Sequence, residues 1–167
     1  MFRMFYPKFD VESSYVIDYE KLYSEGYRGI IYDIDNTLVT HGSPADDRAK
    51  ELIKRLKGIG FKVVLISNNK IKRVSSFAND VGLPFIEDAH KPSKKPYLRA
   101  VEMMGTDIDT TIFVGDQLFT DVWGANRCKI TSFLVKPIHK SEEMQIVIKR
   151  RLEKLVLFYY YKNKKEV

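Results

Sequence analysis

The feature that most constrains the fold is a regular alternation of short apolar segments with segments of helical spacing. The apolar segments are rich in β-branched and aromatic residues, which is typical of strands buried on both faces. They cover residues 29–33, 62–66, 85–86, 111–114 and 131–135. Strands that alternate with helices form parallel sheets covered on both sides. The pattern therefore predicts a Rossmann-like three-layer α/β/α domain with a mainly parallel sheet of five strands.

The segments between these strands leave little room for anything beyond single helices. Ser43 and Pro44 predict a helix N-cap followed by proline at the first helical position, and a short helix is expected from Asp121 to Arg127. The connections after the first two strands are too short to hold a cap domain. A chain of 167 residues also suits one hydrophobic core. We therefore expect a single domain over residues 1–167, without a cap.

Three parts of this domain differ in composition. Residues 1–28 contain eight aromatic residues without a clear period and are expected to form an arm, whereas 29–137 form the core. Residues 138–167 are expected to form a basic amphipathic helix. From Lys136 onward there are nine Lys/Arg and four Asp/Glu, which accounts for five of the net +6 charges. One apolar stripe runs along this helix: Met144, Ile148, Leu152, Leu155 and Tyr159. The stripe either packs against the helices of the sheet or contacts an anionic membrane.

Polar side chains gather after four of the predicted strands. Ligands of parallel sheets bind beyond the carboxyl ends of the strands, so these side chains are expected to share one site. In chain order they are Asp33, Asp35 and Thr37; Ser67, Asn68 and Asn69; Lys91, Lys94 and Lys95; and Asp116 with Asp121.

Their chemical types point to phosphoryl transfer. One carboxylate of the Asp33/Asp35 pair can attack phosphorus, and the other can act as general acid and base. Clustered carboxylates need a cation among them, and oxygen ligands favour Mg²⁺. Ser67 can donate its hydroxyl to a phosphoryl oxygen, and a lysine can neutralise charge on the transferred group.

Three of these groups resemble the motifs of the haloacid dehalogenase-like (HAD) superfamily, over Gly29 to Pro137. The stretch 33–38 (DIDNTL) resembles its first motif, Ser67 its second, and 115–121 (GDQLFTD) its fourth. The resemblance implies Asp33 as nucleophile and Asp35 as general acid/base. It also implies Mg²⁺ ligation by Asp33, Asp116 and the backbone carbonyl of Asp35. Asp121 is implied to hold these ligands in position without binding the metal itself. Thr37, Ser67 and Asn68 are expected to bind the substrate.

The lysine of the site has two candidates. Lys91-Pro92, followed five residues later by Tyr97, fits the spacing of the family and is favoured. Lys95-Pro96 lies closer to the start of the next helix and is the alternative.

Within the superfamily, the chain resembles the YqeG-like branch of subfamily IIIA, which is related to phosphatidylglycerophosphate phosphatases. The residues that carry this resemblance are 35–38 (DNTL), 67–69 (SNN) and 114–122 (VGDQLFTDV). It implies a lipid phosphomonoester as substrate, with phosphatidylglycerophosphate as the leading candidate. The alternatives are a phosphatase of a soluble metabolite or phosphoprotein, and a non-catalytic binding protein of the same fold.

Other sequence features bear on location and partners. Cys128 is the only cysteine, which excludes an intrachain disulfide. There is no apolar segment typical of a signal peptide, and the longest uncharged apolar run, 155–161, is too short to span a bilayer. We expect a cytoplasmic protein, peripheral to the membrane if the C-terminal helix binds there. No nucleic-acid recognition motif is present, and the oligomeric state stays open.

Overall fold

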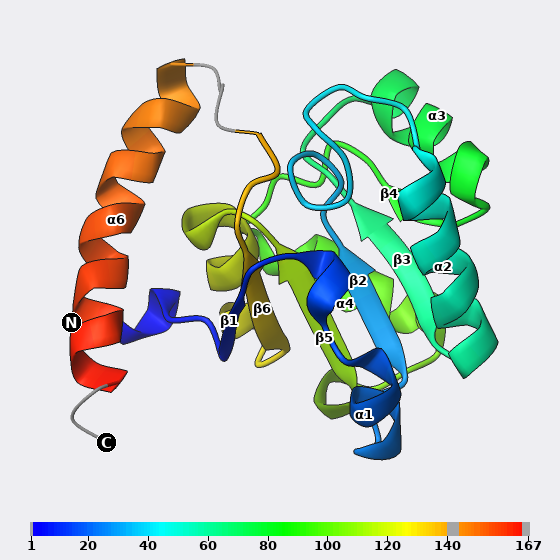
Figure 1. Ribbon diagram of the computed structural model, residues 1–167, viewed down its shortest axis with the longest axis horizontal. Helices are drawn as coiled ribbons and strands as arrows, with labels where there is room; N and C mark the ends of the chain where they lie inside the picture. The colour runs from blue at the N-terminus through cyan, green and yellow to red at the C-terminus, as the bar shows by residue number, and fades with distance from the viewer. Residues whose placement is uncertain (1, 140–143, 165–167) are drawn as a thin grey trace.

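The computed structural model describes residues 2–139 and 144–164, and its centre is one parallel sheet of six strands (Figure 1). The strand order is β1-β6-β5-β2-β3-β4. The strands are β1 (Phe9–Val11), β2 (Gly29–Tyr32), β3 (Lys62–Ile66), β4 (Phe85–Ile86), β5 (Thr111–Gly115) and β6 (Thr131–Val135). The predicted α/β class is confirmed, and every strand pair is parallel. The prediction of five strands is one too few.

The missing strand is β1, which lies in the aromatic N-terminal stretch. It pairs with β6 at the edge of the sheet, and the ring of Phe9 stacks on that of Phe133 at 4.6 Å between centroids. A strand of three residues at a sheet edge is too short to show a period of its own. Two short 3₁₀ turns, η1 (Arg3–Phe5) and η2 (Ser14–Val16), flank it.

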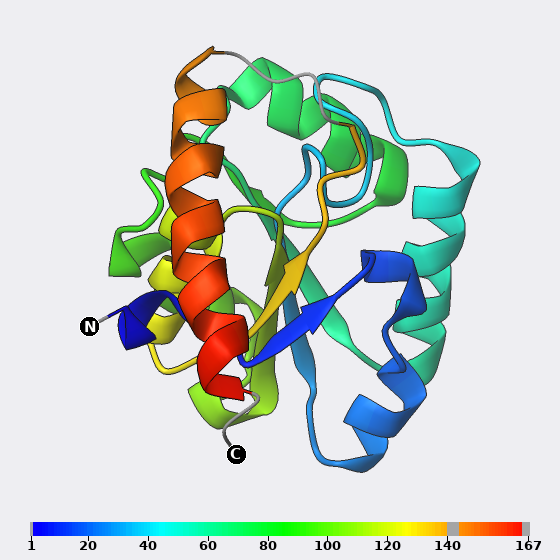
Figure 2. The same cartoon turned by 60° about the vertical axis from the view of Figure 1, so that its left-hand side comes forward.

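Helices cover both faces of the sheet because successive strand residues point to opposite sides. On β2, Ile30 and Tyr32 belong to the core under α1 (Tyr19–Ser24), α2 (Asp47–Ile59) and α3 (Ile71–Val81). Ile31, between them, belongs to the core under α4 (Lys94–Met104) and α5 (Trp123–Arg127). Figures 1 and 2 show these two helical layers. Among the described residues of 29–137 no separate cap is folded over the sheet.

Two helix boundaries differ from the sequence prediction. Helix α2 begins at Asp47, and the carboxylate of Asp46 caps it by accepting from the amide of Ala49 at 2.7 Å. The predicted cap, Ser43, instead lies 2.5 Å from the hydroxyl of Thr40. The predicted helix from Asp121 to Arg127 is a π-helical turn, η4 (Leu118–Val122), followed by α5. A further 3₁₀ turn, η3 (Ile108–Thr110), precedes β5.

The C-terminal helix α6 (Met144–Lys164) packs on the edge of the domain, beside η1 and η4 (Figures 1 and 2). Among residues 148–164, whose side chains the structure describes, Val156 and Tyr160 are the buried apolar ones. The predicted stripe faces outward: Ile148, Leu152, Leu155 and Tyr159 are 57%, 56%, 51% and 42% exposed. The side chain of Met144 lies outside the described part. Of the two alternatives for the stripe, packing on the helices of the sheet is not observed for these four residues.

Candidate active site

The site lies at the carboxyl ends of the two central strands, β2 and β5. Asp33 follows β2 directly, and its amide donates to the carbonyl of Val114 at 3.0 Å. Asp116 follows β5, whose register with β2 places Tyr32 opposite Val114. Two neighbouring parallel strands that end at the same level thus bring the two aspartates together.

Three buried carboxylates form a compact cluster here. One oxygen each from Asp33, Asp116 and Asp121 lies within 4.8 Å of the others. The residues are 7%, 2% and 0% exposed. The cluster contains only oxygen atoms, which is the ligand type that Mg²⁺ prefers.

Lys91 is the cation inside this cluster. Its Nζ lies 2.6 Å from Oδ1 of Asp33 and 2.6 Å from Oδ1 of Asp121. Asn68 holds the lysine from behind, because its Oδ1 accepts from the amide of Lys91 at 2.7 Å. Lys95 is exposed and lines a separate hollow of about 210 Å³ together with His90. The structure therefore places Lys91, and not Lys95, beside Asp33.

The π-helical turn η4 fixes Asp121. Its Oδ2 accepts from the amides of Asp116 and Gln117, both at 3.1 Å. This close approach requires glycine at position 115, since a Cβ there would lie 2.4 Å from Oδ2 of Asp121. Both oxygens of Asp121 are thus engaged by the protein, one by Lys91 and one by backbone amides.

Thr37 and Ser67 bring hydroxyl groups to the same edge. Oγ1 of Thr37 lies 3.2 Å from Oδ2 of Asp33 and 3.4 Å from Oδ1 of Asp116. Ser67 is buried at the end of β3, and its Oγ accepts from the amide of Asn69 at 3.1 Å. That bond leaves the hydroxyl proton of Ser67 available to another acceptor.

The carboxylate of Asp35 is not part of the buried cluster. Its Oδ1 accepts from the amide of Gly42 at 2.7 Å and from Arg73 at 2.8 Å, and its Oδ2 accepts from Asn69 at 2.6 Å. Arg73 was not predicted from the sequence. This residue lies in the first turn of α3, and no motif or spacing marks it.

Helix α6 contributes a second residue that the sequence analysis missed. The guanidinium of Arg150 forms an ion pair with the carboxylate of Asp116 and donates to the carbonyl of the same residue. Glu153 braces this arrangement, because it accepts from Arg150 at 3.0 Å and from the amide of Leu118 at 2.8 Å. In sequence, Arg150 is one of three consecutive basic residues, and only the packing of α6 distinguishes it.

The electrostatics of the cluster follow from its burial. Burial raises the pKa of Asp33 to about 7; Lys91 opposes this shift and Asp121 adds to it. Burial and the charges of Asp33 and Asp121 also raise the pKa of Asp116, against the effect of Arg150. Burial alone would lower the pKa of Lys91, but the two adjacent carboxylates raise it. A divalent cation beside these buried carboxylates would stabilise their ionised forms. The residues present therefore fit Mg²⁺.

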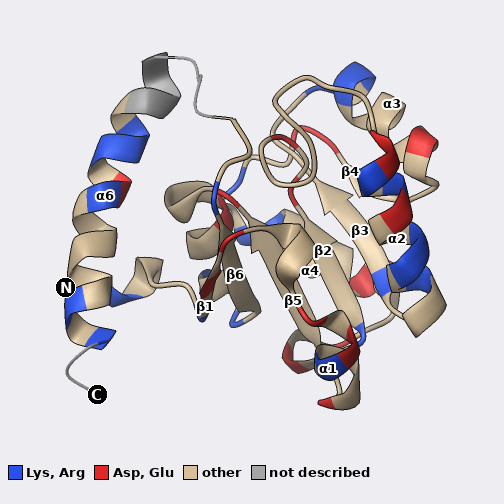
Figure 3. Cartoon of the chain, in the orientation of Figure 1, with Lys and Arg blue, Asp and Glu red and all other residues tan. Residues whose placement is uncertain are grey.

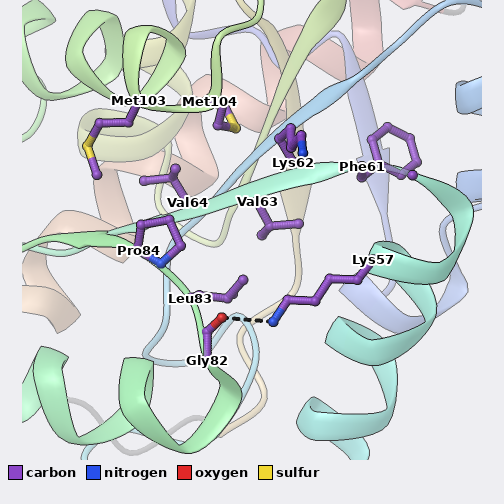
Figure 4. A pocket seen from close by; sticks show the side chains of 11 residues that line it. Lys57, Phe61, Lys62, Val63, Val64, Gly82, Leu83, Pro84, Met103 and Met104 are labelled. Carbon is purple, nitrogen blue, oxygen red and sulfur yellow. Dashed lines mark hydrogen bonds between the residues drawn. The ribbon is translucent and has the colours of Figure 1, made fainter.

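The amino ends of the strands differ from the carboxyl ends. A hollow of about 520 Å³ lies at the amino ends, beside the start of β3 (Figure 4). Its lining includes Val63, Leu83 and Met104, and Nζ of Lys57 donates to the carbonyl of Gly82 at 2.8 Å. No carboxylate, hydroxyl or thiol is among the residues that line this hollow, in contrast to the carboxylate cluster at the carboxyl ends of the strands.

Comparisons with known proteins agree with this geometry. The sequence profile of haloacid dehalogenase-like hydrolases matches residues 40–129. "Probable phosphatase YqeG" of Bacillus subtilis (strain 168) is 38% identical over 156 residues, which cover 93% of this chain and 91% of the relative. "Phosphatidylglycerophosphate phosphatase 1, chloroplastic/mitochondrial" of Arabidopsis thaliana is 30% identical over 165 residues. That match covers 90% of this chain but 47% of the plant protein, so the chain spans about half the length of this relative.

Solved structures show the same fold. A HAD-superfamily hydrolase from Ehrlichia chaffeensis matches with a TM-score of 0.56 at 16% identity, covering 77% of this chain and 97% of that one. The cobalt-bound deoxy-D-mannose-octulosonate 8-phosphate phosphatase from Haemophilus influenzae matches with a TM-score of 0.53 at 15% identity, covering 82% and 90%. The profile match and the Bacillus relative together show that this chain belongs to the haloacid dehalogenase-like hydrolases, among the phosphatases of that family.

Proposed function

We propose that this chain is a Mg²⁺-dependent phosphomonoester hydrolase that forms an aspartyl-phosphate on Asp33. One observation carries the proposal: a buried carboxylate stands between a lysine and a threonine, with two further carboxylates beside it. Lys91 and Thr37 fix the orientation of Asp33, so one of its oxygens can be presented to phosphorus.

Asp33, Asp116 and the backbone carbonyl of Asp35 are the proposed metal ligands. When bound, Mg²⁺ supplies positive charge that favours ionised Asp33 and compensates the negative phosphoryl group. We assign Asp121 a supporting role, because Lys91 and two backbone amides already engage its oxygens.

The proposed reaction has two displacements. An oxygen of Asp33 forms a bond to phosphorus while the bond to the leaving oxygen breaks, and Asp35 gives that oxygen a proton. A water molecule then attacks phosphorus and gives a proton to Asp35, while the bond between phosphorus and Asp33 breaks. This step frees Asp33 and releases inorganic phosphate. Ser67 and Lys91 donate hydrogen bonds to the phosphoryl oxygens, and Asn68 keeps Lys91 in place.

The position of Asp35 suits proton exchange. Its side chain is 11% exposed, at the border between the buried cluster and solvent, where a leaving group departs. Arg73 and Asn69 hold the carboxylate in one orientation. Both are positioning residues in this proposal, since they act on the reaction through Asp35.

The proposed substrate is a lipid phosphomonoester, with phosphatidylglycerophosphate as the leading candidate. The Arabidopsis relative carries that activity in its name, and the absence of a cap among the described residues leaves the site open to a large substrate. The proposal includes action in the cytoplasm on a headgroup presented by a membrane. No described helix is both long enough and apolar enough to cross a bilayer.

A substrate panel tests this proposal. Phosphatidylglycerophosphate in detergent micelles, glycerol phosphates, sugar phosphates and a phosphopeptide are each assayed with Mg²⁺ and with a chelator. Asp33→Asn should lower turnover at least about 1,000-fold, as expected for loss of a nucleophile. Asp47→Asn, an exposed acid in the first turn of α2, is the matched control and should leave turnover unchanged.

Each result of the panel bears on a different part of the proposal. Turnover that survives in Asp33→Asn refutes the mechanism. Preference for a soluble ester over the lipid refutes the proposed substrate and favours a metabolite phosphatase. No turnover of any ester, with binding retained, favours a non-catalytic binding protein.

A further inference from the structure

Helix α6 has an inner face that is fixed to the domain. Val156 and Tyr160 are 3% and 8% exposed, and the ring of Tyr160 lies 5.2 Å from that of Tyr6. Glu153 is also buried and bonds to the amide of Leu118. These contacts attach one side of the helix to η1 and η4 and thereby determine which side points away from the domain.

The outer face is unusually apolar for a surface helix. Six large apolar or aromatic residues of α6 are between 42% and 62% exposed. They are Ile148, Leu152, Leu155, Phe158, Tyr159 and Tyr161; the ring of Tyr159 also contacts that of Phe2, and the hydroxyl of Tyr161 donates to the carboxylate of Asp10. Steps of four, three and four residues separate Ile148, Leu152, Leu155 and Tyr159, so these four form a continuous ridge along the helix. A contiguous exposed patch of this kind marks an interaction site.

The exposed charges of α6 all have one sign. Lys149, Arg151, Lys154, Lys162 and Lys164 are all exposed. The only acidic residue between positions 144 and 164 is Glu153, which points inward. Figure 3 shows Lys and Arg recurring along α6 with a single acidic position among them. An apolar ridge beside basic residues is complementary to a surface with anionic headgroups above hydrocarbon.

The same helix borders the proposed active site. Arg150, on its inner side, forms the ion pair with Asp116, and Glu153 bonds to the first residue of η4. A surface that binds the outer face of α6 would therefore contact the same helix that contributes Arg150 to the carboxylate cluster.

We infer that α6 is a membrane-docking helix that binds the surface of an anionic lipid bilayer through its outer face. The biological purpose of such docking rests on the proposed lipid substrate, because docking would bring the open site close to lipid headgroups. The binding itself requires no catalysis.

Vesicle sedimentation tests the inference with the full chain. The vesicles contain phosphatidylcholine with or without phosphatidylglycerol, neither of which is a phosphomonoester. Wild type should sediment with the anionic vesicles at low salt and dissociate as salt rises. The variant Leu152→Glu/Phe158→Glu should bind at least about 10-fold more weakly, because it places charge on the apolar face. Leu98→Glu/Met103→Glu, two residues of α4 that are each 43% exposed, has the same change in charge and should bind like wild type.

A second pair of variants isolates the charges. Arg151→Gln/Lys154→Gln should weaken binding about 10-fold or more, as expected for two basic residues at an anionic surface. Lys50→Gln/Lys54→Gln, exposed lysines of α2, should leave binding unchanged. Phe158→Ala, with a smaller expected loss, serves if the Glu variants fail to fold by circular dichroism.

Three results would overturn the inference. The first is that wild type does not bind anionic vesicles. The second is that the α4 or α2 control variants lose as much vesicle binding as the α6 variants. The third is that wild type is a dimer in gel filtration and Leu152→Glu/Phe158→Glu is a monomer. The last would make the face a contact between copies. Turnover of p-nitrophenyl phosphate, a soluble ester, should be unchanged in all α6 variants. If wild type turns over no ester of the substrate panel but binds vesicles, the proposed function fails and the docking inference stands.

Discussion

The carboxylate cluster and the outer face of α6 use cationic side chains in opposite ways. At the cluster, the side chain of Lys91 is 4% exposed and lies 2.6 Å from two carboxylates. On α6, Arg151 and Lys154 are exposed beside a ridge of apolar residues. A buried cation in fixed geometry acts strongly on a few atoms, whereas exposed cations act together on a charged surface and are screened by salt. The two regions should therefore respond very differently to substitution.

Within this comparison of cationic side chains, the buried lysine should give the largest effect. Lys91→Ala should lower turnover of a soluble ester about 100- to 1,000-fold, because it removes a preorganised donor and leaves two buried carboxylates without their cation. Steady-state kinetics with Mg²⁺ measure this loss. Lys95→Ala is the control and should stay near wild type. Loss of activity in Lys95→Ala with wild-type activity in Lys91→Ala would reverse the assignment.

Two neighbouring arginines on α6 compare its inner and outer sides directly. Arg150→Gln should lower the metal-free stability by about 2–3 kcal/mol, somewhat less than for a fully buried pair, because its side chain is 18% exposed. This corresponds to a fall in Tm of roughly 5–10 °C. Mg²⁺ should raise the Tm of this variant more than that of wild type, since the cation supplies charge that Asp116 has lost.

Arg151→Gln is the matched control for this comparison. Its side chain is exposed, so its Tm should differ from wild type by no more than about 1–2 °C, with or without Mg²⁺. Differential scanning fluorimetry measures all four values. Equal Tm values for the two variants would show that Arg150 does not stabilise the cluster.

A further expected effect is a pH dependence of stability that arises at the cluster. Burial raises the pKa of Asp33 to about 7 from its ordinary value of 3.8. Between these values the folded state holds a proton that the unfolded state has released, so metal-free stability should fall as pH rises through this window. Mg²⁺ should flatten the slope, because it favours ionised Asp33.

Tm values at pH 5, 6 and 7, with chelator or with Mg²⁺, test this prediction. Asp33→Asn should show a smaller slope than wild type in chelator. An identical slope in that variant would assign the pH dependence to other groups.

The sequence predicted the central strands and most of the polar groups at their ends, because both patterns are local. Ile30, Ile31 and Tyr32 are apolar without interruption, as a strand buried on both faces requires, and Asp33 follows them directly. The start of α2 was placed wrongly because Ser43 and Asp46 are both capable caps. Only the bond between Ser43 and Thr40 and the cap at Asp46 distinguish them.

Arg73 and Arg150 could not be predicted in the same way. Each lies on a helix, and its role depends on which carboxylate the packed helix brings within reach: Asp35 for Arg73 and Asp116 for Arg150. Such a contact arises between residues 38 or 34 positions apart and leaves no periodic signal.

Strand and turn signals depend on neighbours along the chain, so they predicted the α/β class, the end of the sheet that carries the polar groups, and the acidic residues found there. Tertiary structure alone decided three matters: the sixth strand, the arginines that neutralise Asp35 and Asp116, and the side of α6 that faces solvent. An amphipathic stripe shows that one face of a helix differs from the other. Which face becomes buried depends on the surface the helix meets, and here Val156, Tyr160 and the Arg150–Glu153 pair meet it.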